Sequence, residues 1–181
     1  MIEKKIYVFD TSAFIKGMEV GVLQDYSCYT TNGVLSEIKN QFSKQKISTA
    51  LLTGNLMIQT PDPQAIQEVK KIARKSGDLP FLSTIDIGVI AVAITMRTTV
   101  AKQEGIDPND VHIEVVSDDY SVQNVLSQLP IPVHSYMQKG IKNFIQWQIY
   151  CPVCKKVYPS SEKTTCPSCE VRLKRRPVDD K

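Results

Sequence analysis

The sequence predicts an α/β fold: a three-layer α/β/α domain built on a central parallel sheet, followed by a small C-terminal zinc ribbon. Short β-rich runs alternate with helical segments of about ten to twenty residues, an order typical of parallel strands joined by right-handed helical crossovers. Two Cys-x-x-Cys pairs then stand close together near the end of the chain. The 181 residues suffice for one α/β domain of ordinary size and a small appended module.

Each predicted strand of the sheet except the last is followed by residues that can begin a helix. The predicted elements are strands at 5–9, 27–30, 56–59, 113–116 and 133, and helices at 13–16, 34–44, 64–75, 83–104 and 121–129. Thr11 or Ser12, Asn32 and Asp62 are typical N-cap residues for the first three helices. Gly105 is a typical stop for the long apolar helix.

This alternation weakens after residue 130, which predicts a domain boundary. We assign residues 1–137 to the α/β domain, 138–147 to a connector, 148–174 to the ribbon, and 175–181 to a basic tail that we expect to be disordered. The connector is compatible with either an amphipathic helix or an extended linker.

Four cysteines predict a closed metal site in the ribbon. Cys151, Cys154, Cys166 and Cys169 form two Cys-x-x-Cys turns, the spacing that suits one tetrahedral structural Zn²⁺. The alternative, two disulfides in a secreted domain, is less favoured because no signal peptide opens the chain and a fifth cysteine, Cys28, would be odd. Cys28 lies in an apolar run and is expected to be a buried small hydrophobe.

Hydropathy predicts a soluble, cytoplasmic protein that does not act in a membrane. The longest apolar stretch, residues 85–96, is interrupted by Asp86 and Thr95 and is too short to cross a bilayer.

The net charge of +3 is unevenly placed. Residues 1–137 carry 12 Lys and Arg against 15 Asp and Glu, whereas residues 138–181 carry 10 against 4. A basic tail on a mildly acidic body suggests that the tail binds a polyanion while the body holds a cation. A solvated charged tail is the alternative.

Five carboxylates stand where a parallel sheet gathers its ligands, outside the carboxyl ends of the strands. Asp10 follows the first strand, Asp118 and Asp119 follow the strand at 113–116, Glu37 lies in the helix after the second strand, and Asp86 lies near the start of the long helix. Clustered carboxylates stay ionised together mainly when a cation joins them, and oxygen ligands select Mg²⁺ or Mn²⁺. Such a metal site can activate water and stabilise charge on a phosphate, so it is the equipment for phosphodiester hydrolysis.

Each acid also has a structural alternative. Asp86, Asp118 and Asp119 could cap helices, and Glu37 could be an exposed helical residue. Asp62 and Asp78 are interpreted as caps or turn residues.

Four segments resemble the motifs of PIN-domain nucleases. They read Val-Phe-Asp-Thr-Ser-Ala-Phe at 8–14, Val-Leu-Ser-Glu-Ile at 34–38, Gly-Asp-Leu-Pro-Phe-Leu-Ser-Thr-Ile-Asp at 77–86 with Ile-Gly-Val-Ile-Ala after it, and Val-Ser-Asp-Asp-Tyr-Ser-Val-Gln-Asn-Val at 116–125. The last two motifs, together with Trp-Gln-Ile-Tyr-Cys at 147–151 and the ribbon, resemble the Nob family in particular, in a minimal, archaeal-type version. Family members are endoribonucleases that trim the 3′ end of small-subunit ribosomal RNA late in ribosome maturation.

The resemblance implies a set of catalytic residues. Asp10, Glu37, Asp86 and Asp119 would hold the Mg²⁺ or Mn²⁺, with Asp118 in support, because the family pattern places an acid two positions after Thr or Ser. Thr11 and Ser117 would hydrogen-bond the metal's waters or a phosphate. The implied substrate is precursor ribosomal RNA, and the implied partner is the pre-ribosomal small subunit.

Basic and aromatic side chains around the ribbon are the predicted RNA contacts. They are Lys139, Lys142, Trp147, Lys155, Lys156, Arg172, Lys174, Arg175 and Arg176. Tyr150 and Tyr158 could stack on bases or pack the ribbon core, and Trp147 could instead dock the ribbon on the body.

Two other functions fit parts of the sequence. One is a toxin-like PIN ribonuclease that cuts messenger or transfer RNA, although such toxins usually lack a ribbon. The other is a non-catalytic module that binds RNA or the ribosome.

Overall fold

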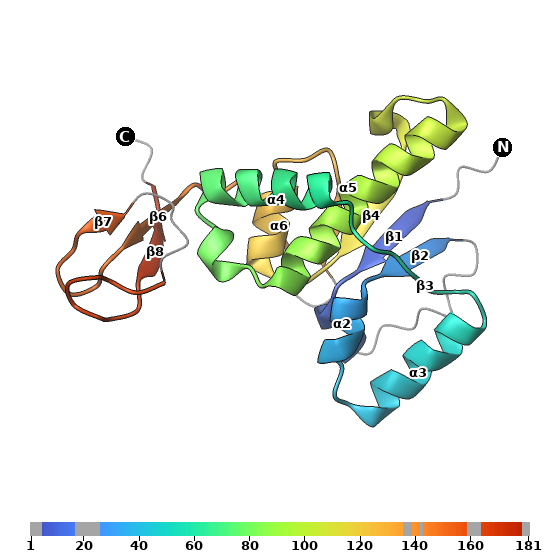
Figure 1. Cartoon of the computed structure of the whole chain (residues 1–181), viewed down its shortest axis with the longest axis horizontal. Helices are drawn as coiled ribbons and strands as arrows, with labels where there is room; N and C mark the ends of the chain where they lie inside the picture. Colours follow the sequence, from blue (N-terminus) through green and yellow to red (C-terminus); the bar gives the residue numbers. More distant parts are fainter. Residues whose placement is uncertain (1–4, 17–25, 136–138, 142, 159–163, 179–181) are drawn as a thin grey trace.

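A computed structural model of the protein describes residues 5–16, 26–135, 139–141, 143–158 and 164–178. Two sheets organise these residues, a larger one in the body and a smaller one in a lobe that lies beside the C-terminal end of the body's helix α4 (Figure 1). The predicted fold class, a parallel α/β domain with a C-terminal cysteine ribbon, is confirmed.

The body is built on a five-stranded parallel sheet with the order β3-β2-β1-β4-β5. Its strands are β1 (Ile6–Phe9), β2 (Ser27–Thr30), β3 (Met57–Ile58), β4 (Ile113–Val116) and β5 (Val133–His134). The central strands β1 and β4 pair in a register that sets Phe9 opposite Val116. The residues after these two strands, Asp10 and Ser117, are therefore neighbours at the carboxyl edge of the sheet.

Helices flank this sheet, in an order that follows the predicted alternation of strands and helices. They are α1 (Thr11–Ile15), α2 (Asn32–Glu37), α3 (Gln41–Leu52), α4 (Pro63–Ser76), α5 (Thr84–Glu104) and α6 (Tyr120–Leu126), with 3₁₀ turns η2 (Leu79–Phe81) and η3 (Pro108–Asp110). The long helix α5 contacts β1, β4, α4 and α6.

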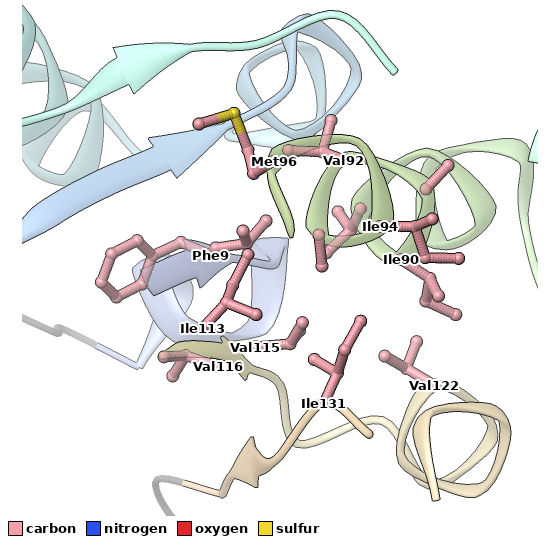
Figure 2. Close-up of a cluster of buried hydrophobic side chains, with 14 of the residues drawn as sticks. Phe9, Ile90, Val92, Ile94, Met96, Ile113, Val115, Val116, Val122 and Ile131 are labelled. Carbon is pink, nitrogen blue, oxygen red and sulfur yellow. The ribbon is translucent and has the colours of Figure 1, made fainter. Parts of the chain in front are cut away.

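Helix α5 is the centre of the hydrophobic core. Its side chains Ile90 and Val92 are fully buried, and Figure 2 shows this helix facing Val115 on the sheet and Val122 on α6. By length and composition alone α5 could cross a membrane, and among the described residues it is the one such helix. Its burial against the sheet and two other helices explains its apolar sequence without a membrane.

The single helix predicted over 34–44 is wrong, because two helices occupy this region. Thr31 caps α2, whereas Ile38 leaves the helix with extended backbone (ψ 107°). Asn40 then begins α3 by accepting hydrogen bonds from the backbone N–H groups of Phe42 and Ser43. An Asn side chain that satisfies backbone donors in this way competes with helix continuation.

The ribbon contains a three-stranded antiparallel sheet with the order β7-β6-β8. Its strands are β6 (Trp147–Tyr150), β7 (Val157–Tyr158) and β8 (Lys174–Pro177). Strand β8 pairs with β6 along its whole length, from Lys174 to Pro177. The ribbon therefore continues past its predicted end at Lys174, and residues 175–177 are ordered, contrary to the prediction of a disordered tail. A basic strand is stable here because β6 satisfies its backbone groups.

The connector before the ribbon forms no helix or strand over residues 139–141 and 143–146, and it is attached to helix α6. Gln123 accepts a hydrogen bond from the N–H of Ile141 (2.9 Å), and Asn124 accepts one from the N–H of Ile145 (2.7 Å). The Gln146 side chain donates to the carbonyl of Lys75 at the end of α4 (2.6 Å). These contacts fix the path of the chain from the body into the ribbon.

Candidate active site and zinc centre

Asp10 lies at the centre of the acidic edge of the sheet. It follows β1, caps α1, and is only 3% exposed. One carboxylate oxygen accepts the N–H of Thr11 (2.7 Å), and the other accepts the hydroxyls of Ser12 (3.0 Å) and Ser117 (2.8 Å). The parallel register of β1 and β4 brings Ser117 to this position, so the contact follows from the sheet topology.

Two further acids, Asp86 and Asp119, lie close enough to Asp10 for charge to couple them to it. Asp86 occupies the first turn of α5, and Asp119 caps α6. Burial raises the pKa of Asp10, hydrogen bonds from Ser117, Ser12 and Thr11 oppose the rise, and the charge of Asp119 adds to it. Burial also raises the pKa of Asp86, against hydrogen bonds from Ser83, and the charges of Asp10 and Asp119 raise it further.

Glu37 joins this group through Thr11. It ends helix α2 on the exposed rim, and its carboxylate accepts the hydroxyl of Thr11 at 2.6 Å. The fold thus brings Asp10, Glu37, Asp86 and Asp119, from four separate segments, to one edge of the sheet. We call these four residues the acidic rim.

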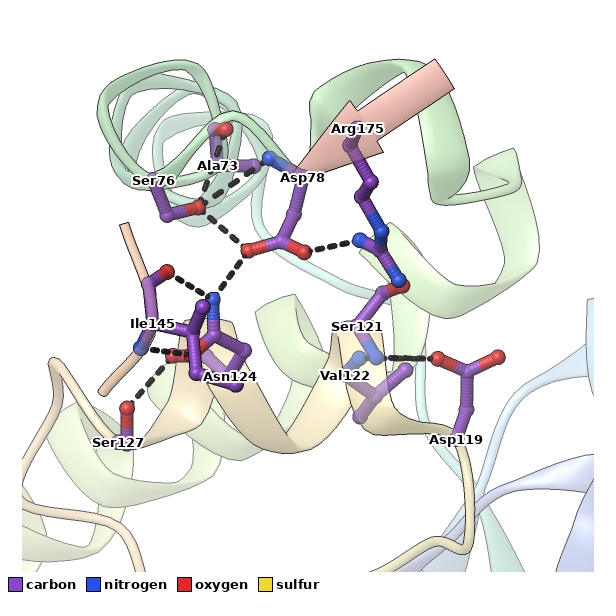
Figure 3. Close-up of polar contacts among 10 residues, drawn as sticks. All are labelled: Ala73, Ser76, Asp78, Asp119, Ser121, Val122, Asn124, Ser127, Ile145 and Arg175. Carbon is purple, nitrogen blue, oxygen red and sulfur yellow. Dashed lines mark hydrogen bonds and ion pairs between the residues drawn. The ribbon is translucent and has the colours of Figure 1, made fainter. Parts of the chain in front are cut away.

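Asp118 faces a different environment from Asp119. Its buried carboxylate forms an ion pair with Lys16 (2.6 Å) and accepts the hydroxyl of Ser135 (2.6 Å). Its backbone N–H donates to the hydroxyl of Ser12 (3.0 Å). Asp119 instead uses Oδ1 to accept the N–H groups of Ser121 (2.6 Å) and Val122 (3.2 Å), and Figure 3 shows it at the start of α6.

The capping alternative holds for several of these acids. Asp10 and Asp119 are N-caps, and Asp86 forms a capping box with Ser83. Asp62 is an N-cap, as predicted. Capping uses only part of the lone pairs of each carboxylate, so it does not prevent a role in cation binding.

The acidic rim is more open than a closed metal cage. Within the described residues, the four ribbon cysteines are the one group of three or more potential ligands that lies close enough to hold an ion directly. A cation at the rim would therefore be held partly through water, which is how proteins usually hold Mg²⁺.

The four cysteines form a compact sulfur cluster, with all ligand atoms within 4.8 Å of one another. The Sγ atoms of Cys154 and Cys166 are 3.9 Å apart, near the edge of about 3.8 Å that four Zn–S bonds of about 2.3 Å produce in a tetrahedron. The cysteines therefore fit one structural zinc ion.

The two cysteine turns have matching backbones. Lys155 and Glu170 both adopt positive φ (60° and 55°) directly after the second cysteine of each pair. Their N–H groups donate to the carbonyls of Cys151 (3.0 Å) and Cys166 (2.9 Å). The Tyr158 hydroxyl lies 3.1 Å from the Cys166 sulfur, a position from which it can stabilise a metal-bound thiolate. Tyr158 thus supports the ribbon core, one of the two roles considered for it.

Most of the predicted RNA contacts are exposed on the ribbon or the connector. The exposed ones are Lys139, Lys155, Lys156, Arg172, Lys174 and Arg176. Lys142 lies outside the described residues. Arg176 stacks its guanidinium over Tyr150 (5.0 Å to the ring centroid) and bonds Gln148.

Arg175 and Trp147 have partners within the protein instead. Arg175 forms an ion pair with Asp78 (2.6 Å), and its guanidinium lies over the Trp147 ring (4.4 Å). The prediction that Arg175 is available to phosphates is therefore not supported, and the docking alternative for Trp147 is. Asp78 stands in a turn at the N-cap position of η2, as the sequence predicted, but its side chain is fully buried and makes no capping bond. No local pattern marks this pair, because 97 positions separate its members.

Comparison with known proteins agrees with the fold. Residues 7–96 match the family model for the PIN domain of ribonuclease. The chain is 34% identical to the endoribonuclease Nob1 of Methanothermobacter thermautotrophicus, over 93% of this chain and 91% of that protein.

Other relatives include both kinds of ribonuclease considered above. The endoribonuclease Nob1 of Pyrococcus abyssi is 31% identical over 93% of this chain and 92% of its own length. The ribonuclease VapC1 of Thermoplasma acidophilum is 32% identical over 94% of this chain and 77% of its own length. Because several Nob1 proteins match nearly the whole chain, ribbon included, the chain belongs to the Nob1 family of PIN-domain endoribonucleases.

Proposed function

We propose that this endoribonuclease cuts precursor small-subunit ribosomal RNA at the mature 3′ end, in the cytoplasm and on the pre-ribosomal small subunit. The family resemblance supplies the substrate. The observation that carries the site assignment is the convergence of Asp10, Asp86 and Asp119. The charge of Asp119 raises the pKa of the other two acids, and Glu37 is linked to the group through Thr11.

In this proposal the acidic rim binds Mg²⁺ or Mn²⁺. The raised pKa values of Asp10 and Asp86 mean that their ionised forms are costly without a cation, so a divalent ion would relieve the repulsion. When bound, such an ion supplies a more acidic water and stabilises negative charge on the scissile phosphate. Cleavage would leave a 3′-hydroxyl and a 5′-phosphate.

The other residues of the site hold the acids and the substrate in place. Ser12 and Ser117 orient the buried carboxylate of Asp10, and Thr11 orients Glu37. The Lys16–Asp118 pair and the Ser12 contact fix the loop that carries Asp119. The exposed Lys and Arg side chains of the ribbon would attract the RNA backbone that the acidic body alone would repel.

The test is cleavage of a short RNA that spans the 3′ end of the small-subunit ribosomal RNA, with Mn²⁺, with Mg²⁺ and without divalent cation. We expect one metal-dependent cut at the mature end. In Asp10→Asn the rate should fall at least about 1,000-fold while RNA binding persists, because the substitution removes a charge that only the metal and the transition state require.

Asp110→Asn is the matched control, since it removes one exposed acid outside the rim and should cleave as the wild type does. Cleavage that survives Asp10→Asn would refute the site assignment. Metal-dependent cuts at scattered positions would contradict the ribosomal substrate.

A second substrate class is favoured by one comparison, the similarity to the ribonuclease VapC1. In that case the chain would cut messenger or transfer RNA. Preferential cleavage of transfer RNA over the ribosomal fragment, in the same reaction, would support this alternative.

A further inference from the structure

The ribbon is attached to the body through a buried ion pair. The Asp78 side chain, between α4 and η2, has no exposed surface, and Arg175 on β8 reaches it at 2.6 Å. The hydroxyl of Ser76 (2.7 Å) and the side-chain amide of Asn124 (2.6 Å) donate to the other Asp78 oxygen. Figure 3 shows these groups converging on one carboxylate from α4, α6 and β8. We call Asp78, Asn124 and Arg175 the clamp.

Aromatic rings from both modules enclose the cation of the clamp. The Arg175 guanidinium lies 4.5 Å from the ring centroid of Phe81 in the body and 4.4 Å from that of Trp147 in the ribbon. The backbones also meet closely, because a Cβ atom on Gly77 would lie 2.7 Å from the carbonyl oxygen of Trp147. Gly77 has φ +81°, so both its conformation and this contact favour glycine.

The hydrogen bonds and ion pair of the clamp favour one fixed orientation of the ribbon on the body, and not merely contact between the two. Well-packed apolar residues usually stabilise an interface as well as a buried ion pair does, but they do not define direction. A carboxylate that accepts bonds from three named donors is satisfied in one arrangement only. The clamp also withdraws Arg175 from the basic surface that would bind RNA.

The clamp and the acidic rim share structural elements. Helix α6 begins at its cap Asp119 and carries Asn124 five positions later, a rise of about 7.5 Å along one rigid helix. On the other side, η2 leads from Asp78 directly into Ser83 and Asp86 at the start of α5. The ribbon is therefore anchored to the same elements that carry two of the rim acids, Asp86 and Asp119. Its position relative to those acids changes if the clamp is broken.

We propose that Asp78, Asn124 and Arg175 are positioning residues that hold the ribbon in one place relative to the acidic rim and so determine which phosphodiester is cut. This inference rests on the proposed function, in which the ribbon grips RNA and the rim cuts it. Adjacent phosphates of an RNA strand are only a few ångströms apart, so a loosened ribbon would present neighbouring bonds to the rim.

The test compares Arg175→Met with Arg176→Met in the full zinc-loaded chain. Both variants lose one positive charge from the same strand, but only Arg175 belongs to the clamp. The substrate is the end-labelled ribosomal RNA fragment in Mn²⁺, with products mapped to single nucleotides. Zinc content and circular dichroism verify folding, and solution scattering reports how closely the ribbon is docked.

For Arg175→Met we expect cuts spread over adjacent phosphodiesters, a kcat lowered at least tenfold, and an increased radius of gyration. RNA affinity should fall in both variants, and by no more in Arg175→Met than in Arg176→Met. In Arg176→Met the bond that is cut should nevertheless stay the wild-type one. Gly77→Ala disturbs the contact with Trp147 from the body's side without removing any charge, so it should also spread the cuts. If Arg175→Met does not fold, Gly77→Ala is the variant that tests the proposal.

A single wild-type cut at unchanged kcat in Arg175→Met and Gly77→Ala would overturn this proposal while the proposed function stands. Equal behaviour of Arg175→Met and Arg176→Met would also overturn it, because Arg175 would then act only as a charge. If the wild type itself cuts nothing, the proposed function fails, and the positional role falls with it.

Discussion

Neighbouring acids in this protein have different roles because their side chains point to different partners. Asp118 and Asp119 are adjacent, yet Asp118 is buried against Lys16 and Ser135, whereas Asp119 caps α6 on the rim. The charge of Asp119 raises the pKa of both Asp10 and Asp86. At the residue scale, therefore, orientation separates the candidate metal ligand from its structural neighbour.

Asp119→Asn should lower metal-dependent cleavage at least about 100-fold with little change in stability, because Asn caps a helix about as well as Asp does. Asp118→Asn should instead lower the free energy of unfolding by about 2 kcal/mol, less than a fully buried pair would lose, since Lys16 is partly exposed. Urea unfolding and single-turnover cleavage measure the two effects. Loss of cleavage in Asp118→Asn, with loss of stability in Asp119→Asn, would instead identify Asp118 as the metal ligand.

The buried charge of Asp10 should make the body less stable as pH rises. Its pKa in the folded chain lies above the ordinary value of 3.8, so the folded state favours the protonated acid. The stability that this provides is complete below 3.8 and is lost as pH rises through the raised pKa. Without Mg²⁺ or Mn²⁺, Asp10→Asn should therefore melt at a higher temperature than the wild type at pH 7.5.

This advantage should shrink as the pH is lowered toward 3.8 and when Mn²⁺ is added, since either change relieves the wild-type charge. The difference in melting temperature is measured by thermal unfolding followed by circular dichroism of the helices. Asp110→Asn is the control for loss of an exposed charge. A lower melting temperature for Asp10→Asn at pH 7.5 would contradict this account.

At the scale of elements, the ribbon depends on its metal far more than the body does. The buried residues of the ribbon core are Ile149, Cys151, Cys166 and Leu173, two of which are themselves ligands. The body has its own large core around α5. Modules with so little apolar core usually need a metal or disulfides to fold.

Removal of zinc by a chelator should therefore unfold the ribbon and leave the helical body folded. Cys154→Ala should do the same, whereas Cys28→Ala, at a buried thiol outside the cluster, should keep one zinc per chain. Metal analysis and proteolysis of the ribbon measure the outcome. A chain without zinc whose ribbon still resists protease would show that the metal is not its main support.

At the scale of the whole molecule, charge is divided between an acidic rim on the body and a basic ribbon. The exposed cations of the ribbon are Lys155, Lys156, Arg172, Lys174 and Arg176. The clamp fixes this basic surface at one position relative to the rim. The proposed function thus assigns RNA binding to the ribbon and catalysis to the body.

RNA affinity should consequently fall steeply with salt. Single-stranded nucleic acids lose about 0.7 in log K per tenfold rise in salt for each phosphate contact, so five contacts predict a slope of about −3.5. Arg176→Met should reduce this slope by about 0.7. Lys44→Met, which removes an exposed charge from α3, should leave the slope unchanged. Fluorescence anisotropy titrations at several salt concentrations measure the slope for the wild type and both variants.

Local sequence patterns were sufficient for the order of the elements and for the residues that gather at the sheet edge. The strand at Ile113–Val116 has its predicted bounds, and α5 begins one residue after its predicted start because Ser83 is its cap. The four cysteines were recognisable because the two members of each pair are only three positions apart in the sequence. Acids that directly follow strands reach one edge in any parallel sheet.

What the local pattern could not determine is which distant side chains meet. The break between α2 and α3 depends on the capping bonds of Asn40, and the different roles of Asp118 and Asp119 depend on Lys16 and Ser135. The sequence by itself determined the kind of fold, the four-cysteine cluster and the candidate acids, since those follow from spacing and periodicity. Only the tertiary structure decided that Arg175 and Asp78 clamp the ribbon to the body, because a contact across 97 positions exists only once both modules have folded.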